Sequence, residues 1–592
     1  MALVTLQPSR VRESLKAPAS LGIDLLMLVV VGSLGGALFS FGREVSSKSA
    51  GSIEINLSLW ALPLYTFFSL TRGFAAYALS LIFTLIYGSI AAHNRRAEKF
   101  MVPALDVLQS IPVLSFLPVL VLAMIRVFPG RELGLEIACV VMIFTGQAWN
   151  MTFSYYSSVK ALPNHLREVA TVHCLTKWQT FRLLELPASM IGLVWNSMMS
   201  MAGGWFFLSL AEAFKLKGQS FQLPGIGSYM ARAIIDGNHR AEIGAVVAMI
   251  LMIVAVDQLF WRPIVAWSER FKVEETPDAD KAQSWVLTLL SHSLAYQGFR
   301  RMMQERKQKR ALATAPAGGG PGGNGLQVPS GSPLRSQPAA STQLMQRLNY
   351  AMLAVLAAVA LWGALTLVKL LGQVDFGQWL RVMEALLLTS VRTTVAVLVG
   401  AAWTLPVGIL IGRSAKWSQR LQPVVQVLAS FPAPMLFPLV YFAMLWMHIP
   451  FGTGCIVLMM MGTQWYILFN VIAGTSAIPS ELKEVARVYH TPVMKRWTRV
   501  YIPGVFPHLV TGLITAAGGA WNATIVSECL QLNADKQVTT FGLGSMIAQA
   551  TDSDFPLLAA STITMALAVV LINRFMWKRL YHLAERKYSL NV

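Results

Sequence analysis

Two loops of the chain hold a glutamate in the same setting, and these carboxylates are the side chains best placed for chemistry. The first loop reads LPNHLREVATVHCLTKWQTFRLLELP and contains Glu168, whereas the second reads IPSELKEVARVYHTPVMKRWTRVYIP and contains Glu484. A carboxylate can accept a bidentate pair of hydrogen bonds from an arginine of a partner protein. We therefore predict that these loops dock onto a partner and make no covalent bonds.

The alternative is that each loop is a self-contained surface helix whose glutamate pairs with its own lysine or arginine. One loop alone would favour that alternative, but 316 residues separate both Glu168 from Glu484 and Pro187 from Pro503. Two copies at a constant spacing favour docking. The predicted docking residues are Glu168, Val169, Ala170, Pro187, Glu484, Val485, Ala486 and Pro503.

Other kinds of chemistry are not predicted for this chain. It has no Gly-Lys dipeptide and therefore lacks the phosphate-binding loop of Walker-type ATPases. The histidines show no strong metal-ligand spacing, and the four cysteines form no CxxC pair. We expect neither a catalytic residue nor a metal or cofactor in this chain, which is therefore not expected to be an enzyme.

The composition indicates that a membrane positions these loops. Of the 592 residues 55% are apolar and 13% are charged, against about 25% charged in soluble domains. The 48 lysines and arginines exceed the 29 aspartates and glutamates, and basic residues collect in the cytoplasmic loops of membrane proteins. We attribute the positive net charge to the membrane and not to nucleic acid.

Apolar runs of about 20 residues, long enough to cross a bilayer as a helix, occur twelve times. The expected spans are 22–41, 66–92, 104–126, 135–157, 187–211, 241–265, 347–371, 390–412, 424–447, 452–475, 503–528 and 555–577. We predict an all-α integral membrane protein with about 12 transmembrane helices and a retained first span. Basic loops after the second and fourth span of each half predict that both termini lie in the cytoplasm.

The spans fall into two sets of six, which predicts three regions. Residues 1–265 and 347–592 each form a six-span repeat, and residues 266–346 form a cytoplasmic linker. The linker is expected to begin with an amphipathic helix, whose basic end either rests on anionic lipid headgroups or is a solvated charge run. Its remainder, rich in Ala, Pro, Gly and Ser, is expected to be disordered.

Further residues repeat between the two halves. Pairs 316 residues apart are Trp149 and Trp465, Gly203 and Gly519, Trp205 and Trp521, and Glu212 and Glu528. Pairs 320 residues apart are Arg72 and Arg392, Gly88 and Gly408, and Pro112 and Pro432. Because six is an even number, the two repeats are parallel, and an axis along the membrane normal relates them. We expect a pathway between them.

Uncharged polar and aromatic side chains within the spans are candidates for the wall of that pathway. Amide and indole N–H groups can hold an anion without the trapping effect of a full charge. The candidates are Trp149, Asn150, Asn196, Trp205, Gln464, Asn470, Trp521 and Asn522. The alternative is that these groups serve helix packing.

Two glutamates and two arginines near the outer face are assigned other roles. Glu212 and Glu528 end the fifth span of each half, and because a carboxylate repels an anion we expect a structural or outer-gate role. Arg72 and Arg392 are expected to anchor the second span at the membrane interface.

The duplicated loop resembles the Glu-Ala-Ala signature of permease subunits of binding-protein-dependent ABC importers. That signature has a proline nineteen residues after its glutamate, which Pro187 and Pro503 match. It also has a glycine six residues after the glutamate, where this chain has Cys174 and His490. Because neither residue adopts positive φ as readily as glycine, the turn there is expected to differ from that of the family.

The segment GGAWNATIVSE at 518–528 resembles the nitrate, sulfonate and taurine branch, and the whole chain resembles its duplicated, fused tandem form. The resemblance implies two six-helix permease repeats of the type I importer kind in a bacterial inner membrane. It implies ATP-driven import of a small solute, such as a nitrate, sulfonate, taurine or bicarbonate anion. The implied partners are two ABC ATPase subunits, which hold ATP and Mg, a periplasmic or extracellular solute-binding protein, the solute and membrane lipid.

Two other classes of membrane protein fit the sequence less well. An ion-coupled secondary transporter with two six-span halves would need a charge relay near the midplane, and the sequence shows no acidic cluster there. A membrane enzyme would need a His or Asp cluster of catalytic spacing, which the spans lack.

Overall fold

The computed structural model describes most of both predicted repeats. The described residues are 54–271 and 361–588, except 111, 130, 131, 217, 218, 477 and 533–535, with a few isolated positions elsewhere. The expected span 22–41, most of the expected span 347–371 and almost all of the expected linker therefore lie outside the described residues. The chain divides into two compact units, one of residues 37–283 with 374–592 and one of residues 1–36 with 284–373.

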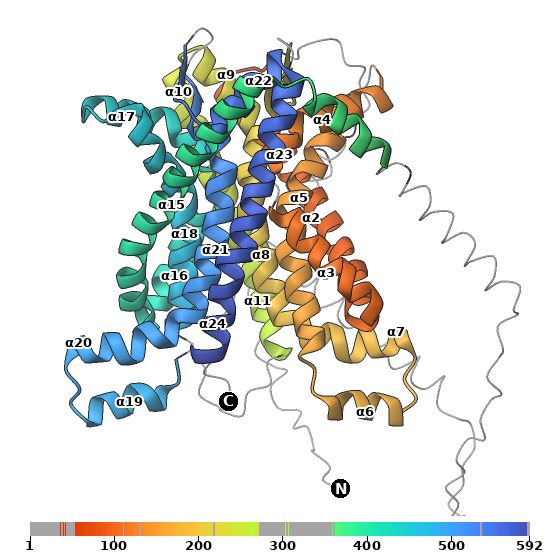
Figure 1. Ribbon diagram of the computed structural model, residues 1–592. Coiled ribbons are helices and arrows are strands. Elements are labelled where there is room, and N and C mark those ends of the chain that lie inside the picture. Colours follow the sequence, from red (N-terminus) through yellow and green to blue (C-terminus); the bar gives the residue numbers. More distant parts are fainter. Residues whose placement is uncertain are drawn as a thin grey trace, which may run out of the picture. The chain divides into compact units, whose positions relative to one another are not determined.

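The larger unit contains almost all of the described helices (Figure 1), and in the smaller unit the described element is the apolar helix Leu361–Leu371. The long helices of the first half are α2 (Leu62–His93), α5 (Leu133–Lys160), α8 (Leu186–Ala211) and α10 (His239–Val256). Those of the second half are α15 (Phe376–Gly412), α18 (Phe451–Ser476), α21 (Ile502–Ser527) and α23 (Phe555–Ile572).

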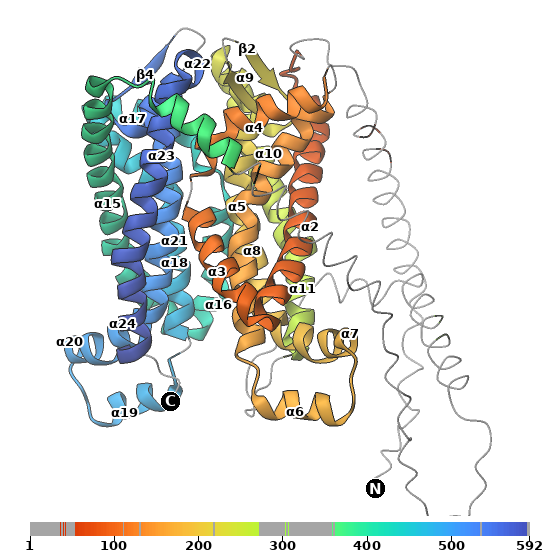
Figure 2. The same cartoon turned by 45° about the vertical axis from the view of Figure 1, so that its right-hand side comes forward.

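Glycines let the helices of each half pack closely. Gly88 of α2 lies against the ring of Tyr155 in α5, and Gly408 of α15 lies against Val471 in α18. A side chain at either glycine would overlap its neighbour. Such small residues allow membrane helices to approach one another, and Figure 2 shows α5 beside α2 and α8, and α18 beside α21.

The third expected span of each half is interrupted. In the first half, α3 (Arg95–Ser110) ends just before Pro112, and α4 (Val113–Val127) begins after it. In the second half, α16 (Ala415–Ser430) is followed by the 3-10 turn η5 (Ala433–Leu436) and α17 (Phe437–Trp446), with a bend of 79°. Proline has no backbone N–H to donate and disfavours helical conformation in the residue before it, which favours a break at these positions.

Four π-helical turns interrupt other helices at matching places. They are η2 (Phe181–Glu185), η3 (Asp257–Trp261), η6 (Trp497–Tyr501) and η7 (Asn573–Trp577), and the helices α11 (Arg262–Ser268) and α24 (Lys578–Tyr588) follow η3 and η7. Pro187, Pro263 and Pro503 each come two residues after such a turn. A proline crowds the carbonyl four residues earlier, and the wider turn accommodates that carbonyl without ending the helix.

A short β-hairpin and a helix follow α8 in the first half and α21 in the second half. The hairpins pair β1 (Ala213–Leu216) with β2 (Gln219–Gln222) and β3 (Cys529–Gln531) with β4 (Gln537–Thr539), both antiparallel. The helices are α9 (Ile226–Ile235) and α22 (Leu543–Ser553). The hairpins were not expected from the sequence, because their strands are only three or four residues long.

Seven described helices are long and apolar enough to cross a membrane, or eight if the bent pair α16–α17 forms one span. The halves contact each other through α16 with α8 and α10, α3 with α23, and α4 with α21. The fold class is thus a helical integral membrane protein whose two halves pack within one compact unit.

Candidate functional site

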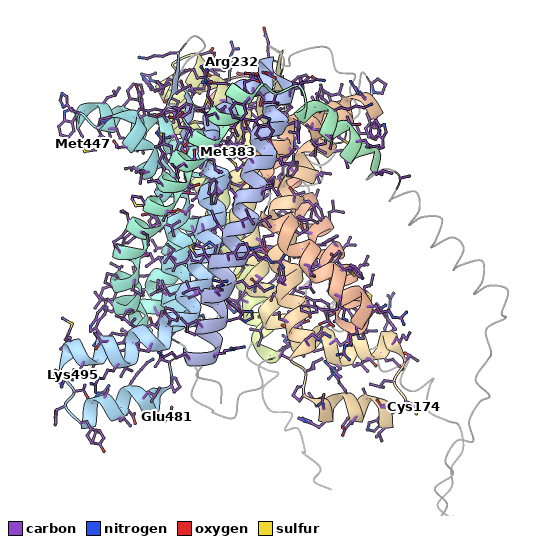
Figure 3. All side chains as sticks on the ribbon, viewed as in Figure 1. Cys174, Arg232, Met383, Met447, Glu481 and Lys495 are labelled. Atoms are coloured by element: carbon purple, nitrogen blue, oxygen red, sulfur yellow. The ribbon has the colours of Figure 1, made fainter. Side chains whose placement is uncertain are left out.

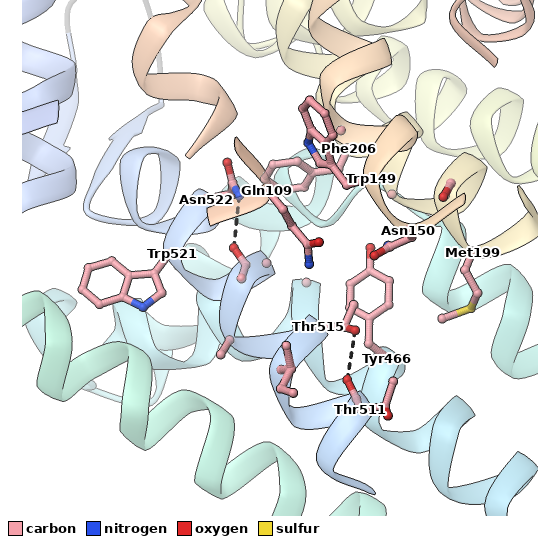
Figure 4. Close-up of a pocket in the computed structure, with 18 of the residues that line it drawn as sticks. Gln109, Trp149, Asn150, Met199, Phe206, Tyr466, Thr511, Thr515, Trp521 and Asn522 are labelled. Atoms are coloured by element: carbon pink, nitrogen blue, oxygen red, sulfur yellow. Dashed lines mark hydrogen bonds between the residues drawn. The ribbon is translucent and has the colours of Figure 1, made fainter. Parts of the chain in front are cut away.

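A cavity of about 470 Å³ lies between the two halves, and its wall comes mainly from α5, α8, α18 and α21. In Figure 4 the labelled side chains of Asn150 and Tyr466 face this space from the two halves. Tyr466 reaches across the boundary, because its hydroxyl would lie 3.4 Å from a Cβ at Gly203 of α8. The cavity is therefore built jointly by both halves.

The wall of the cavity is largely apolar, with polar side chains scattered over it. Its described residues include no Asp, Glu, Lys or Arg. Asn196 and Asn470 each donate an amide hydrogen bond to the carbonyl four residues earlier, at 3.0 and 2.8 Å. The Ser200 hydroxyl is buried and has no hydrogen-bond partner among the described residues. These groups can offer hydrogen bonds to a solute without binding it through an opposite charge.

Six of the eight residues predicted from the sequence to line a pathway lie on this wall. They are Trp149, Asn150, Asn196, Asn470, Trp521 and Asn522. The other two lie elsewhere: Trp205 is buried against Gly73 of α2, and Gln464 accepts a hydrogen bond of 2.9 Å from the indole of Trp403. A pathway role for the six stays a prediction.

Several residues of the wall were not predicted from the sequence. Tyr466 is one, although it stands 316 residues after Asn150 and the repeat could have found it. Gln109 and Ser200 also line the cavity. No sequence signal points to Gln109, because the break between α3 and α4 is what brings this helix end to the cavity.

A buried charged cluster joins three elements of the first half near the hairpin. The Glu212 carboxylate accepts hydrogen bonds from Ser69 at 2.6 Å, from Arg72 at 2.8 Å and from the N–H of Gly227 at 2.7 Å. Arg72 also binds both oxygens of Glu136 at 2.6 Å. Because every oxygen of these carboxylates is engaged, the buried charges are compensated.

The second half contains a matching but simpler cluster. The Glu528 carboxylate accepts hydrogen bonds from Thr389 at 2.9 Å, Arg392 at 3.0 Å and the N–H of Gly544 at 2.8 Å. Gly452 corresponds to Glu136 by the spacing of 316 residues, and a Cβ there would lie 3.6 Å from the Arg392 guanidinium. The second cluster therefore has one carboxylate where the first has two.

These clusters correct the expectation for the two arginines. Arg72 has no exposed surface and Arg392 is 7% exposed, so both are internal pairing partners and not anchors at the membrane interface. Glycines are required next to the glutamates, because a Cβ built on Gly225 or Gly542 would overlap the carboxylate of Glu212 or Glu528. A structural role for the glutamates fits these contacts.

Two helical arms project from the same end of the long helices (Figure 1). The first arm comprises α6 (Asn164–Val172) and α7 (Lys177–Thr180), which continues through η2 into α8. The second comprises α19 (Ser480–Val488) and α20 (Val493–Arg496), which continues through η6 into α21. The first arm thus joins α8 through a π-helical turn and Pro187, and the second arm joins α21 through a π-helical turn and Pro503.

The bends of both arms adopt the glycine conformation without glycine. Cys174 has φ +50° and His490 has φ +43°. The N–H of Leu175 bonds to the carbonyl of Ala170, and the N–H of Thr491 bonds to that of Ala486, as in a Schellman motif. Both bends thus adopt positive φ although neither residue is glycine, at the cost of backbone strain.

The two predicted docking glutamates are exposed on the arms. Neither Glu168 nor Glu484 makes a hydrogen bond or ion pair with any described residue. Val169 and Val485 beside them are each 52% exposed, whereas Ala170 and Ala486 are buried within their own arms. Each arm therefore presents a carboxylate and an apolar side chain outward, and uses its alanine for internal packing.

The bases of the arms differ between the halves. In the first half, His93 at the end of α2 contacts Glu185 of η2 at 2.7 Å. In the second half, Arg413 at the end of α15 lies over the ring of Tyr501 in η6, 5.1 Å from its centre. The first contact ties α2, and the second ties α15, to the foot of the arm in the same half.

Near the first arm, α3 is held to α5 by one half-buried carboxylate, that of Glu98. Lys160 and Tyr156 of α5 donate hydrogen bonds of 2.8 and 2.5 Å to Glu98 of α3. These hydrogen bonds favour the charged carboxylate and lower the pKa of Glu98 below its ordinary value of 4.5. Within the described part of the chain, no group of three His, Cys, Asp or Glu side chains could hold a metal ion.

Known proteins share parts of this architecture. The chain is 29% identical over 146 residues to the nitrate import permease protein NrtB of Synechococcus elongatus, covering 25% of this chain and 51% of that protein. It is 28% identical over 162 residues to the putative aliphatic sulfonates transport permease protein SsuC of Bacillus subtilis, covering 27% and 54%. It is 27% identical over 157 residues to the bicarbonate transport system permease protein CmpB of Synechococcus elongatus, covering 26% and 54%.

These matches span about half the length of each relative. A family model covers more of this chain, because it matches twice, over residues 59–260 and 404–587. The two matched regions contain the two arms and most of the cavity wall, and they fit two permeases fused in tandem. The chain belongs to the family described as the inner membrane component of binding-protein-dependent transport systems.

Proposed function

We propose that this chain supplies both transmembrane halves of an ATP-driven importer for a small solute. One observation carries the proposal: each half presents an arm with an exposed glutamate that has no partner among the described residues, at the same turn of the same helix. An exposed carboxylate beside an exposed valine is suited to an arginine and an apolar groove on another protein. Two such surfaces call for two partner subunits.

The partners are proposed to be two ABC ATPase subunits, which would supply ATP and Mg outside this chain. Force applied to an arm would reach the cavity through a continuous helix, because α7, η2 and α8 follow one another without a break, as do α20, η6 and α21. The wall residues of α8 and α21 would then move with the arms. The docking residues proposed are Glu168, Val169, Glu484 and Val485, with Ala170, Ala486, Pro187 and Pro503 shaping the arms.

The proposed architecture is two parallel six-span repeats, residues 1–265 and 347–592, joined by a cytoplasmic linker at 266–346. The arms and both termini would lie in the cytoplasm of a bacterial cell, where basic loops remain during insertion. The hairpins and the charged clusters would face outward, toward a solute-binding protein. The equal spacing of Glu168–Glu484 and Glu212–Glu528 supports this parallel arrangement.

The proposed solute is a small anion of the nitrate, sulfonate, taurine or bicarbonate kind, by analogy with the relatives. The cavity supports this class of solute, because no carboxylate lines its described wall to repel an anion and no Lys or Arg to retain it. An ion-coupled secondary transporter would instead need an acidic relay along the pathway, and the described cavity wall contains no Asp or Glu. The buried Glu212 and Glu528 serve fixed hydrogen bonds away from the cavity.

Purification of the full chain from its native membrane tests the proposal. We expect two ATPase subunits to copurify per chain, and we expect ATP-dependent uptake of a radiolabelled anion once the complex and its binding protein are reconstituted in vesicles. Uptake driven by a proton or sodium gradient without ATP would refute the importer and favour the secondary transporter.

A further inference from the structure

One hydrogen bond crosses from the second half to the broken helix of the first. The side-chain oxygen of Asn522 in α21 accepts the backbone N–H of Val113, the first residue of α4, at 2.7 Å. This N–H has no acceptor within its own helix, because the first turn of a helix always leaves such groups unsatisfied. Asn522 therefore caps a helix of the other half, and asparagine is among the best capping residues.

The orientation of the Asn522 amide is fixed by its second contact. Its nitrogen donates to the carbonyl of Gly518 at 3.1 Å, and a carbonyl can only accept. The oxygen must then face Val113, whose N–H can only donate. The contact is thus determined by donor and acceptor chemistry at both ends.

The hydrogen bond lies at the end of the cavity that is remote from the arms. The wall residues of α21 run from His508 to Ala523, and Asn522 is close to the end of this series. Beyond it lie the buried Glu528 cluster and the hairpin β3–β4. Val113 and Gln109, on either side of the helix break, line the same end of the cavity.

The corresponding place in the other half lacks this bond. Phe206 stands 316 residues before Asn522, and Ala433 stands 320 residues after Val113. Helix α8, which carries Phe206, contacts η5, which begins at Ala433, just as α21 contacts α4. The side chain of phenylalanine has no hydrogen-bonding group, so Phe206 cannot make the bond that Asn522 makes.

We propose that Asn522 is a gating residue that holds α4 across the outer end of the cavity and keeps it closed in this conformation. The proposal rests on the importer function above for the meaning of the outer side. Opening toward that side separates α4 from α21 and breaks the bond, after which water satisfies the Val113 N–H. The gate differs between the halves: α4 is held by a hydrogen bond to Asn522, whereas the corresponding segment, η5 with α17, has no equivalent of that bond among the described residues.

Labelling of a cysteine in the cavity tests this gate without ATP, partner or solute. The parent is the full chain with Cys174→Gly, which removes the exposed native thiol, and Thr515→Cys, which places a thiol on the cavity wall. A membrane-impermeant maleimide is added to vesicles from the outer side. Asn522→Leu is expected to label about fivefold faster, because one net hydrogen bond of about 1 kcal/mol no longer favours the closed state.

A matched variant keeps the test specific. Phe206→Leu changes the counterpart residue of the other half and is expected to label at the parental rate. Equal labelling rates for Asn522→Leu and the parent would overturn the proposal. So would an equally large rise in the labelling rate of Phe206→Leu, or a faster labelling of Asn522→Leu from both sides of the membrane. Absence of uptake by the parent would count against the importer function. The gate would still be tested by the difference in labelling rate between Asn522→Leu and the parent.

Discussion

The guanidinium of Arg72 and the carboxylate of Glu212 lie 2.8 Å apart, and neither side chain has any exposed surface. The corresponding pair, Arg392 and Glu528, is 3.0 Å apart. The first arginine has a second carboxylate, Glu136, and the second has none among the described residues, since Gly452 takes that place. The second cluster should therefore tolerate the loss of its glutamate less well than the first.

Glu528→Ala is expected to destabilise the chain more than Glu212→Ala. Loss of Glu528 leaves Arg392 as a buried charge without a carboxylate, which costs about 3–5 kcal/mol, whereas Arg72 keeps Glu136 when Glu212 is lost. The measurement is the apparent unfolding temperature of the purified chain in detergent. Glu136→Ala is the matched control and should be the mildest of the three; equal losses for Glu212 and Glu528 would contradict the prediction.

Gly225→Ala and Gly542→Ala are expected to destabilise the chain by about 1–3 kcal/mol each, since a methyl group there overlaps a buried carboxylate. The readout is again the apparent unfolding temperature, with the yield of monodisperse protein. Gly363→Ala is the control, because its methyl group would meet no described atom within 4 Å. Unchanged stability in both cluster variants would show that the carboxylates can move aside.

Cys174→Gly and His490→Gly are expected to stabilise the arms. Both positions have positive φ, where a residue with a Cβ loses about 1 kcal/mol relative to glycine. Amide hydrogen exchange of α6 or α19 should slow about fivefold in the variant of that arm alone. His490→Val, with a β-branched side chain, should act in the opposite direction, and faster exchange in both glycine variants would refute the strain.

Charge reversal at both arms is expected to separate ATP hydrolysis from transport. Glu168→Arg with Glu484→Arg replaces two unpaired carboxylates by cations that repel an arginine-bearing partner. Reconstituted uptake should fall at least tenfold while membrane insertion is unaffected. Glu242→Arg, at the opposite end of the long helices from the arms, serves as the control. Uptake by the double variant at the rate of the parent would contradict a docking role for Glu168 and Glu484.

The tie between α3 and α5 is expected to be insensitive to pH over the neutral range. The folded-state pKa of Glu98 is lowered, so its contribution to stability is full above the ordinary value of 4.5 and is lost as pH falls through the lower folded value. Unfolding temperatures of the parent and of Glu98→Gln should differ equally at pH 8 and pH 6 and converge only in acid. Convergence already at pH 6 would contradict the lowered pKa.

Much of this organisation could be predicted from the sequence, because hydropathy and repetition are properties of residue order. The long helices occur where apolar runs predicted them, and the loops around Glu168 and Glu484 form matching arms. The interrupted third spans were missed, since a proline in an apolar run signals a break only when the neighbouring contacts are known. Figure 3 shows the exposed bends near Cys174 and Lys495, whose conformation also depends on context.

The kind of side chain on the cavity wall could be predicted from the sequence, but not every residue that lies there. Asn196 and Asn470 lie on the cavity wall as uncharged polar groups, whereas Trp205 is buried against Gly73 of α2. Sequence spacing cannot tell which face of an apolar helix meets a cavity when all faces are apolar. The extra carboxylate at Glu136 was likewise not predicted, because it departs from the repeat that relates the two halves.

Because both arms belong to one polypeptide, a single mutation gives a protein with one altered arm and one unaltered arm. In a symmetric assembly of two identical permeases every codon change would appear twice, so a defect in one arm could not be studied against an intact one. Here α6 and α19 are encoded separately. A single-site library would therefore alter one arm at a time, and the contribution of each arm to transport could be measured beside an intact counterpart.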